Sequence, residues 1–203
     1  MSEGRHIGVI LPAAGRSRRM GRSKPLLPLG DTDFLGTILA TIRSCEVVDG
    51  PIVVVRRDED DALAQRLRAE SGFGVIDVIV DGAGQMLESI RAGEARLGEA
   101  GGALVWPVDA PATRRSTVAA LCSAAMQEPG RAVLPVVQGA DGHPVYVPRG
   151  LLAGPGEAST LREILAAAAP RRLALDDPLA LLNVNTPEDY QTLLATFAVP
   201  RNV

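Results

Sequence analysis

Short runs of β-branched and other apolar residues alternate with segments of helical periodicity over the first two thirds of the chain. We predict buried strands at residues 7–11, 52–55, 75–80 and 103–108. Between them, apolar residues recur every three or four positions, as Leu35, Ile38, Leu39 and Ile42 do, which predicts helices at 34–42, 58–71, 86–97 and 116–127. Strand–helix alternation at this spacing is typical of βαβ units and indicates a mostly parallel sheet.

The pattern changes after Ala132. Strands are predicted at 133–137 and 145–147, and the connection between them is too short to hold a crossover helix, which favours an antiparallel hairpin added to the sheet. A short helix at 161–168 and a strand at 179–184 follow. Thr186 and Pro187 then predict a helix start, with Thr as N-cap and Pro at the first helical position. We therefore expect one α/β domain over residues 1–203, Rossmann-like, with three αβα layers.

Composition narrows the class of protein. The 203 residues are 46% hydrophobic and 22% charged with a net charge of −3, which excludes a disordered chain and offers no general attraction for nucleic acid. Cys45 and Cys122 lie too far apart in sequence to suggest a disulfide framework or a thiolate metal cage. The N-terminus lacks an apolar signal region, and no apolar stretch approaches the roughly 20 residues of a membrane span. We expect a cytoplasmic protein whose partners include neither nucleic acid nor membrane.

The segment with the clearest chemistry is residues 11–24, which leaves the first strand. It combines small residues with four arginines and Lys24. Ligands of open α/β sheets bind beyond the carboxyl ends of the strands, and small residues let backbone N–H groups approach an anion while cations neutralise it. The spacing of Gly15 and Gly21 to Lys24 fits neither a Walker A loop nor GxGxxG. The segment therefore predicts a polyanion site of another type, and the alternative is a solvated basic loop.

Three further residues, Asp109, His143 and Trp106, are candidates for the site. Asp109 follows the fourth strand, where its carboxylate could reach Mg²⁺ at the sheet edge or could cap the turn before Pro111. His143 lies in the predicted hairpin, where it could contact a substrate or serve structure alone, whereas His6 precedes the first strand. Trp106 could belong to the core or border the site.

The segment 13–24, Ala-Ala-Gly-Arg-Ser-Arg-Arg-Met-Gly-Arg-Ser-Lys, resembles the AAGxSxRMGxxK signature of the MobA-like nucleotidyltransferases. The resemblance continues, in the same order, at residues 106–111, 142–145 and 183–190. Among these enzymes the chain is most similar to the molybdenum cofactor cytidylyltransferases. The resemblance implies a nucleotidyltransferase fold with a nucleotide-binding half at 1–130 and an acceptor-binding half at 131–203.

The resemblance also implies roles for individual residues. The nucleotide would be held by residues of the signature and of a second segment that contacts the base: Ala13, Ala14, Gly15, Arg16, Ser17, Arg19, Lys24, Gly84 and Ser89. Among these, Arg19 would hold the β- and γ-phosphates and Lys24 the α-phosphate. Asp109 and Asn185 would hold Mg²⁺, and His143 and Arg162 would contact the acceptor. Simpler alternatives are a turn-forming Asn185, a loop Gly84, a Ser89 on a helix surface and a solvated Arg162.

The expected reaction is transfer of CMP from CTP to the phosphate of molybdopterin with release of pyrophosphate, and a client molybdoenzyme is a further candidate partner. Ala14 favours CTP, since related GTP users more often have Gly there. Pro12 departs from the usual Leu and matches instead the cytidylyltransferase of methylerythritol phosphate isoprenoid synthesis. Alternatives are cytidylyl or uridylyl transfer to a sugar or polyol phosphate, a nucleotide-binding protein that delivers cofactor without turnover, and a domain that merely binds phosphate.

Overall fold

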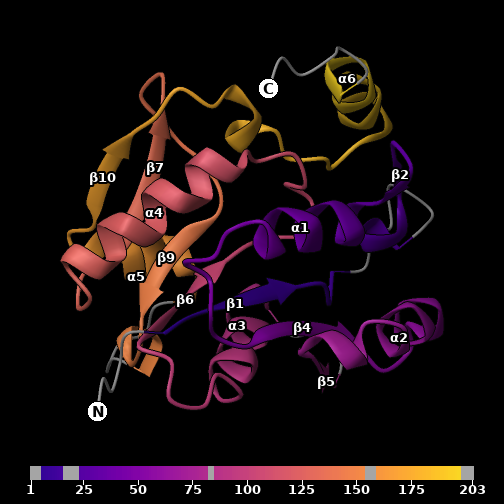
Figure 1. Cartoon of the computed structure of the whole chain (residues 1–203), viewed down its shortest axis with the longest axis horizontal. Helices are drawn as coiled ribbons and strands as arrows, with labels where there is room; N and C mark the ends of the chain where they lie inside the picture. The colour runs from indigo at the N-terminus through magenta and orange to yellow at the C-terminus, as the bar shows by residue number, and fades with distance from the viewer. Residues whose placement is uncertain (1–5, 16–22, 82–84, 154–158, 198–203) are drawn as a thin grey trace.

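The computed structural model describes residues 6–15, 23–81, 85–153 and 159–197. Its main sheet has eight strands in the order β10-β7-β9-β6-β1-β4-β5, with β8 paired to β7 (Figure 1). The strands of this sheet are β1 (Ile7–Pro12), β4 (Ile52–Arg57), β5 (Val75–Val80), β6 (Gly102–Val105), β7 (Val133–Val137), β8 (Ala140–Asp141), β9 (Val145–Pro148) and β10 (Arg171–Ala174). A separate small hairpin joins β2 (Pro28–Leu29) and β3 (Thr32–Asp33).

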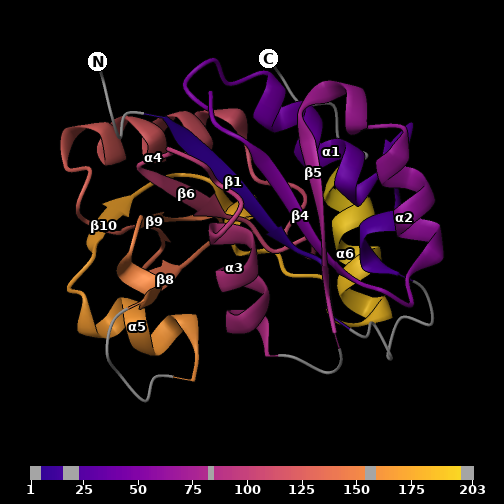
Figure 2. The ribbon, with the colours of Figure 1, turned by 90° about the horizontal axis from the view of Figure 1, so that it is seen from below.

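Helices cover both faces of the sheet, as Figure 2 shows. One face packs against α1 (Phe34–Arg43), α2 (Asp61–Arg68) and α4 (Arg115–Gln127), and the other against α3 (Met86–Glu94) and α5 (Leu161–Ala167). A hydrophobic core lies on each face of the sheet. Strand β1 contributes to both cores, because alternate residues of a strand point to opposite faces. Val9 and Leu11 belong to the first core and Ile10 to the second. The predicted three-layer α/β architecture is thus confirmed.

The parallel half of the sheet follows the predicted pattern. β1 pairs in parallel with both β4 and β6, and β4 pairs in parallel with β5. All six residues of β1 are buried, as expected for a central strand covered on both faces. In the parallel strands β1 and β6, the carboxyl ends therefore open on the same edge of the sheet.

The predicted antiparallel hairpin is confirmed. β9 pairs antiparallel with both β6 and β7, so it lies inside the sheet between them. β10 is the edge strand and pairs in parallel with β7. The sequence does not predict β10, because Arg171–Ala174 alternates exposed and half-buried positions and has no run of apolar residues.

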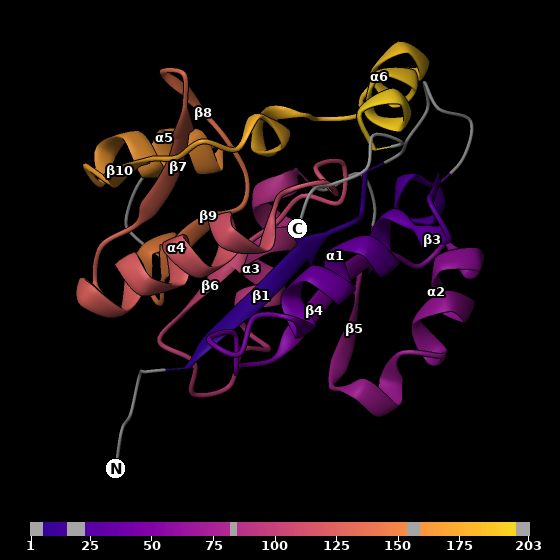
Figure 3. The ribbon, with the colours of Figure 1, turned by 45° about the horizontal axis from the view of Figure 1, so that its top comes forward.

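The strand predicted at 179–184 is wrong. The structure has instead the 3-10 helix η4 (Pro178–Leu181), followed by an irregular segment that leads to α6 (Pro187–Phe197), as Figure 3 shows. Asp177 caps η4 by accepting from the Leu179 N–H, and Pro178 at the first position fixes the backbone for a helical turn. Leu179 and Val184 are buried, but they pack against α6 in a third core rather than in the sheet.

Shorter 3-10 turns complete the described part of the chain: η1 (Lys24–Leu26), η2 (Ser71–Phe73) and η3 (Leu151–Ala153). Within the described residues, none of the helices combines the length and apolar character needed to cross a membrane.

Candidate active site

Three segments far apart in sequence meet at one edge of the sheet. β1 and β6 are parallel neighbours, so the segments that follow them begin side by side. The backbone N–H of Val184 donates to the carbonyl oxygen of Asp109 at 2.8 Å, which fixes the segment before α6 against the end of β6. This backbone bond brings Asn185 to the same place as Asp109.

Lys24 is the point of contact between these segments. Its Nζ donates to Oδ2 of Asp109 at 3.2 Å and to Oδ1 of Asn185 at 2.8 Å. The side chains of Lys24 and Asp109 are only 15% and 20% exposed, so the ion pair is partly shielded from water. The chain has 20 arginines and one lysine, and this lysine stands here. An ammonium is a compact charge, unlike the planar guanidinium, so the two cations are not interchangeable at this position.

A second contact fixes the backbone next to Lys24. Oγ of Ser23 donates to Oδ2 of Asp60 at 2.6 Å, and Oδ1 of Asp60 accepts from the Leu63 N–H as the N-cap of α2. Lys24 then begins η1, with Pro25 inside the turn. Asp60 was not predicted from the sequence to support this site, although an Asp ahead of an amphipathic helix is a recognisable cap.

Asp189 positions Asn185. Oδ2 of Asp189 accepts the backbone N–H groups of Asn185 at 2.9 Å and of Thr186 at 2.8 Å, and Oγ1 of Thr186 accepts from the Asp189 N–H. These backbone hydrogen bonds, first that of Asn185, hold the pKa of Asp189 below its ordinary value, and the charge of Lys24 lowers it further. With the turn satisfied by Asp189, the Asn185 amide oxygen is available to Lys24.

The structure decides several of the simpler alternatives. The Asn185 side chain bonds Lys24 rather than the Thr186 turn. Trp106 is fully buried in the core, where its Nε1–H donates to the carbonyl oxygen of Ala110, so it does not border the site. Ser89 is 2% exposed and is therefore not a helix-surface residue.

The structure describes only some of the remaining residues that were predicted to bind the nucleotide. Ala13 is buried, Ala14 half-buried and Gly15 exposed just beyond β1, and the Ala13 N–H donates to the carbonyl oxygen of Val55 at 2.7 Å. Four residues predicted to bind the nucleotide lie outside the described residues: Arg16, Ser17, Arg19 and Gly84.

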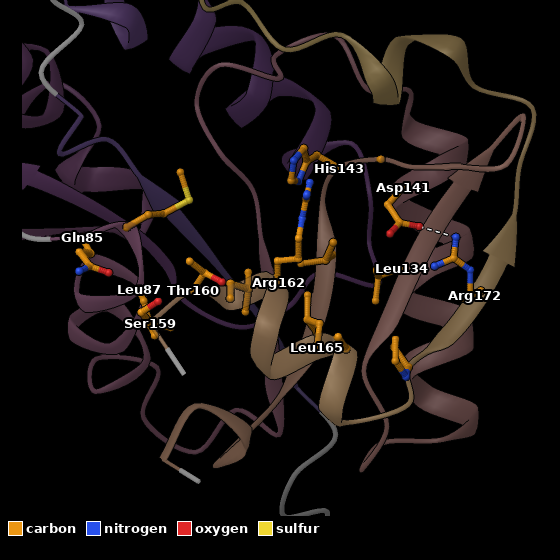
Figure 4. Close-up of a pocket in the computed structure, with 16 residues that line it drawn as sticks. Gln85, Leu87, Leu134, Asp141, His143, Ser159, Thr160, Arg162, Leu165 and Arg172 are labelled. Atoms are coloured by element: carbon orange, nitrogen blue, oxygen red, sulfur yellow. Dashed lines mark ion pairs between the residues drawn. The ribbon is translucent and has the colours of Figure 1, made fainter. Parts of the chain in front are cut away.

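A pocket of about 880 Å³ lies between α3, α5 and the strands β7, β8 and β10 (Figure 4). It brings together His143 and Arg162, the two residues predicted to contact the acceptor. In Figure 4 the Arg162 side chain extends from α5 toward the His143 ring. The pocket also includes Asp141 and Arg172, which the sequence analysis did not select because their meeting depends on strand pairing.

The backbone around His143 is firmly held. Its N–H donates to the carbonyl oxygen of Ala180 at 2.9 Å, and its own carbonyl accepts from Oγ1 of Thr113 at 3.0 Å. The ring Nδ1 is buried and has no hydrogen-bond partner within the described part of the chain. Burial lowers the pKa of His143, the Asp109 charge opposes this effect, and the Arg162 charge adds to it. The imidazole is therefore neutral at neutral pH.

Comparison with protein families and curated sequences relates this chain to NTP transferases. The family model described as "MobA-like NTP transferase domain" matches residues 8–178. The 2-C-methyl-D-erythritol 4-phosphate cytidylyltransferase of Geobacter metallireducens is 33% identical over 96 residues. That match covers 44% of this chain and 41% of the relative, so the chain spans less than half of this curated relative's length.

Solved structures match over nearly the whole chain. The Rv0371c homologue from Mycobacterium sp. strain JC1 is 29% identical with a TM-score of 0.77, over 96% of this chain and 98% of that one. Rv0371c from Mycobacterium tuberculosis H37Rv is 25% identical with a TM-score of 0.79, over 94% and 98%. Molybdopterin-guanine dinucleotide biosynthesis protein A from Archaeoglobus fulgidus, at 17% identity and a TM-score of 0.68 over 94% and 98%, shares the fold.

Proposed function

The chain belongs to the MobA-like NTP transferase family, and from this premise we propose that it transfers CMP from CTP to the phosphate of molybdopterin and releases pyrophosphate. The observation that carries the proposal is the convergence of Lys24, Asp109 and Asn185 at the edge of the sheet, with His143 and Arg162 in the neighbouring pocket.

Nucleotidyl transfer requires positioning and charge neutralisation more than covalent chemistry by the protein. An acceptor phosphate oxygen attacks the α-phosphorus of CTP, and the bond to the leaving pyrophosphate breaks. The Lys24 ammonium neutralises charge on the α-phosphate as it develops, and its rigid backbone, held through Ser23 and Asp60, keeps it in place. Mere binding would not need a cation at the α-phosphate, which argues for turnover over a delivery protein.

The donor set at Lys24 fits a divalent cation. Oδ2 of Asp109 and Oδ1 of Asn185 already face one positive charge, and both are the hard oxygen ligands that Mg²⁺ takes. No group of three or more His, Cys, Asp or Glu side chains in the described ranges could hold a metal. Mg²⁺ bound at Asp109 and Asn185 together with phosphate oxygens would neutralise the triphosphate.

The pocket lined by His143 and Arg162 offers a surface for a heterocyclic acceptor body. Its wall includes Leu87, Leu134 and Leu165, against which a flat ring can pack. Arg162 supplies a cation for the acceptor phosphate, and neutral His143 can donate one hydrogen bond. A phosphate acceptor is already ionised at neutral pH, so the reaction needs no general base.

The choice of base rests on Ala14. Its methyl group takes room that Gly would leave for a larger purine, which favours CTP.

The direct test is a pyrophosphate-release assay on the purified chain with Mg²⁺. CTP, GTP, UTP and ATP are each offered with molybdopterin, with 2-C-methyl-D-erythritol 4-phosphate and with a sugar phosphate. The proposal requires release with CTP and molybdopterin above every other pair. Release that depends on UTP and a sugar phosphate would exclude it.

The second candidate is cytidylyl transfer to a polyol phosphate. The observation in its favour is the 33% identity to the Geobacter enzyme, whose name gives that activity. The same assay separates the two candidates, since they share the nucleotide and differ in the acceptor.

A further inference from the structure

An ion pair lies at one end of the acceptor pocket. Nη2 of Arg172 lies 2.6 Å from Oδ1 of Asp141, and the two side chains are 51% and 50% exposed. Both line the pocket, and Figure 4 shows them on the far side of Leu134 from Arg162 and His143. A half-exposed pair contributes little to stability, so folding alone does not account for its place.

Strand pairing explains how two distant residues meet there. Asp141 on β8 stands opposite Val136 of β7, and Arg172 on β10 stands opposite Leu134 of β7. Leu134 and Val136 are two positions apart, so they share one face of the sheet. The strand β7 therefore holds the carboxylate and the guanidinium side by side, on the face that α5 covers.

The pocket combines polar groups with an apolar wall. In Figure 4, His143 and Arg162 lie between Gln85, Ser159 and Thr160 on one side and the Asp141–Arg172 pair on the other. Leu134 and Leu165 belong to the apolar wall. A ligand that reaches from Arg162 to the ion pair needs an anionic group near Arg162, a flat or apolar body along this wall, and a hydrogen-bonding edge at the ion pair.

We infer that Asp141 and Arg172 determine acceptor specificity by binding a heterocycle edge with an N–H beside a carbonyl group. The carboxylate accepts from the N–H and the guanidinium donates to the carbonyl oxygen, and both bonds are charge-assisted. The lactam edge of an aminopyrimidinone ring has these groups, whereas a polyol phosphate lacks them. The inference rests on the proposed function and adds to it the two residues that select the acceptor.

The test uses Arg172→Ala, Arg172→Gln and Asp141→Ala in the full chain. We expect each to raise the KM for molybdopterin by about tenfold or more, because one hydrogen bond to the heterocycle edge is lost. The kcat and the KM for CTP should stay near the wild-type values. Arg171→Ala is the matched control. Arg171 is the neighbour on β10, does not line the pocket, and bonds Gln127 and Glu128 instead.

A second readout does not depend on turnover. Titration with a fluorescent pterin phosphate measures binding directly, and it should be weakened by the three pocket substitutions and unchanged by Arg171→Ala. Unchanged molybdopterin KM in the Arg172 variants, or an equal loss in the control, overturns the inference.

If the wild type releases no pyrophosphate with any acceptor, the proposed function fails. The titration then tests only whether the Asp141–Arg172 pair binds the pterin. In that case wild-type binding that is lost in Arg172→Ala supports the pair. Absence of binding to the wild type, or equal binding by Arg172→Ala, excludes it.

Discussion

Nζ of Lys24 lies 2.8 Å from Oδ1 of Asn185, a residue 161 positions later in the chain. The same ammonium lies 3.2 Å from Oδ2 of Asp109. These two oxygens are the ones that suit the divalent cation, so Lys24 and the cation would bind the same donors. Two positive charges this close repel strongly in a partly buried site. The cation is therefore expected to bind well only when triphosphate oxygens add negative charge and draw Lys24 away.

Lys24→Gln tests this competition. Without nucleotide, the variant should bind Mn²⁺ roughly tenfold more tightly than the wild type, because the competing ammonium is gone. Mn²⁺ is a suitable probe, since it takes the same carboxylate and carbonyl oxygen ligands as Mg²⁺ and is paramagnetic. Turnover should fall by about 100-fold or more, because the cation at the α-phosphate is lost. Electron paramagnetic resonance of free Mn²⁺ and the pyrophosphate assay measure the two effects.

Weaker Mn²⁺ binding by Lys24→Gln would contradict the competition. If the wild type shows no turnover and Lys24→Gln loses only nucleotide affinity, the protein is a nucleotide-binding protein and not an enzyme.

Asp189→Ala tests how Asn185 is positioned. The substitution removes the acceptor of two backbone N–H groups at the start of α6, so the unfolding temperature should fall. The Mn²⁺ affinity measured with CTP should fall as well, because Asn185 loses its support. Glu188→Ala, a change of the other acidic residue in the first turn, is the control. Equal losses in both variants would mean that charge at the helix start, and not the Asp189 hydrogen bonds, is responsible.

The pH dependence of stability should contain a term from His143. Its pKa in the folded protein lies below the ordinary value of 6.5, so in the unfolded chain it takes up a proton at higher pH. The contribution of His143 to the free energy of unfolding is therefore fully present above about pH 6.5. It is lost as the pH falls toward the pKa of His143 in the folded protein. His143→Gln should show a smaller loss of unfolding temperature between pH 7.5 and about pH 5.5 than the wild type. Parallel curves for the two proteins would show that His143 does not contribute.

The contact between two of the predicted site residues follows from where their strands end. Lys24 and Asp109 follow β1 and β6, and parallel strands open on the same edge, so their meeting could be expected from the pattern alone. Asn185 could be placed only through resemblance, because its position depends on a backbone bond between Val184 and Asp109.

Errors arise where tertiary contacts override the local pattern. The apolar residues at 179–184 predict a strand, yet Asp177 and Pro178 begin a 3-10 turn, and Leu179 and Val184 pack with α6. The Asp141–Arg172 pair lies beyond sequence reasoning for a related reason. It depends on the register of β8 and β10 against β7, which short strands do not determine locally.

The glycine before His143 is required by a close approach of two segments. A Cβ at Gly142 would lie 2.9 Å from the carbonyl oxygen of Ala180, the same oxygen that accepts the His143 N–H. Gly142→Ala must push η4 and the His143 backbone apart, at a cost of about 1–3 kcal/mol in unfolding free energy. Because His143 lines the acceptor pocket, the KM for the acceptor should rise more than the KM for CTP. Gly130→Ala, where a Cβ meets no atom of the described residues within 4 Å, is the matched control. Denaturant unfolding and steady-state kinetics of both variants measure the difference, and equal behaviour would show that η4 yields to the added methyl group without moving His143.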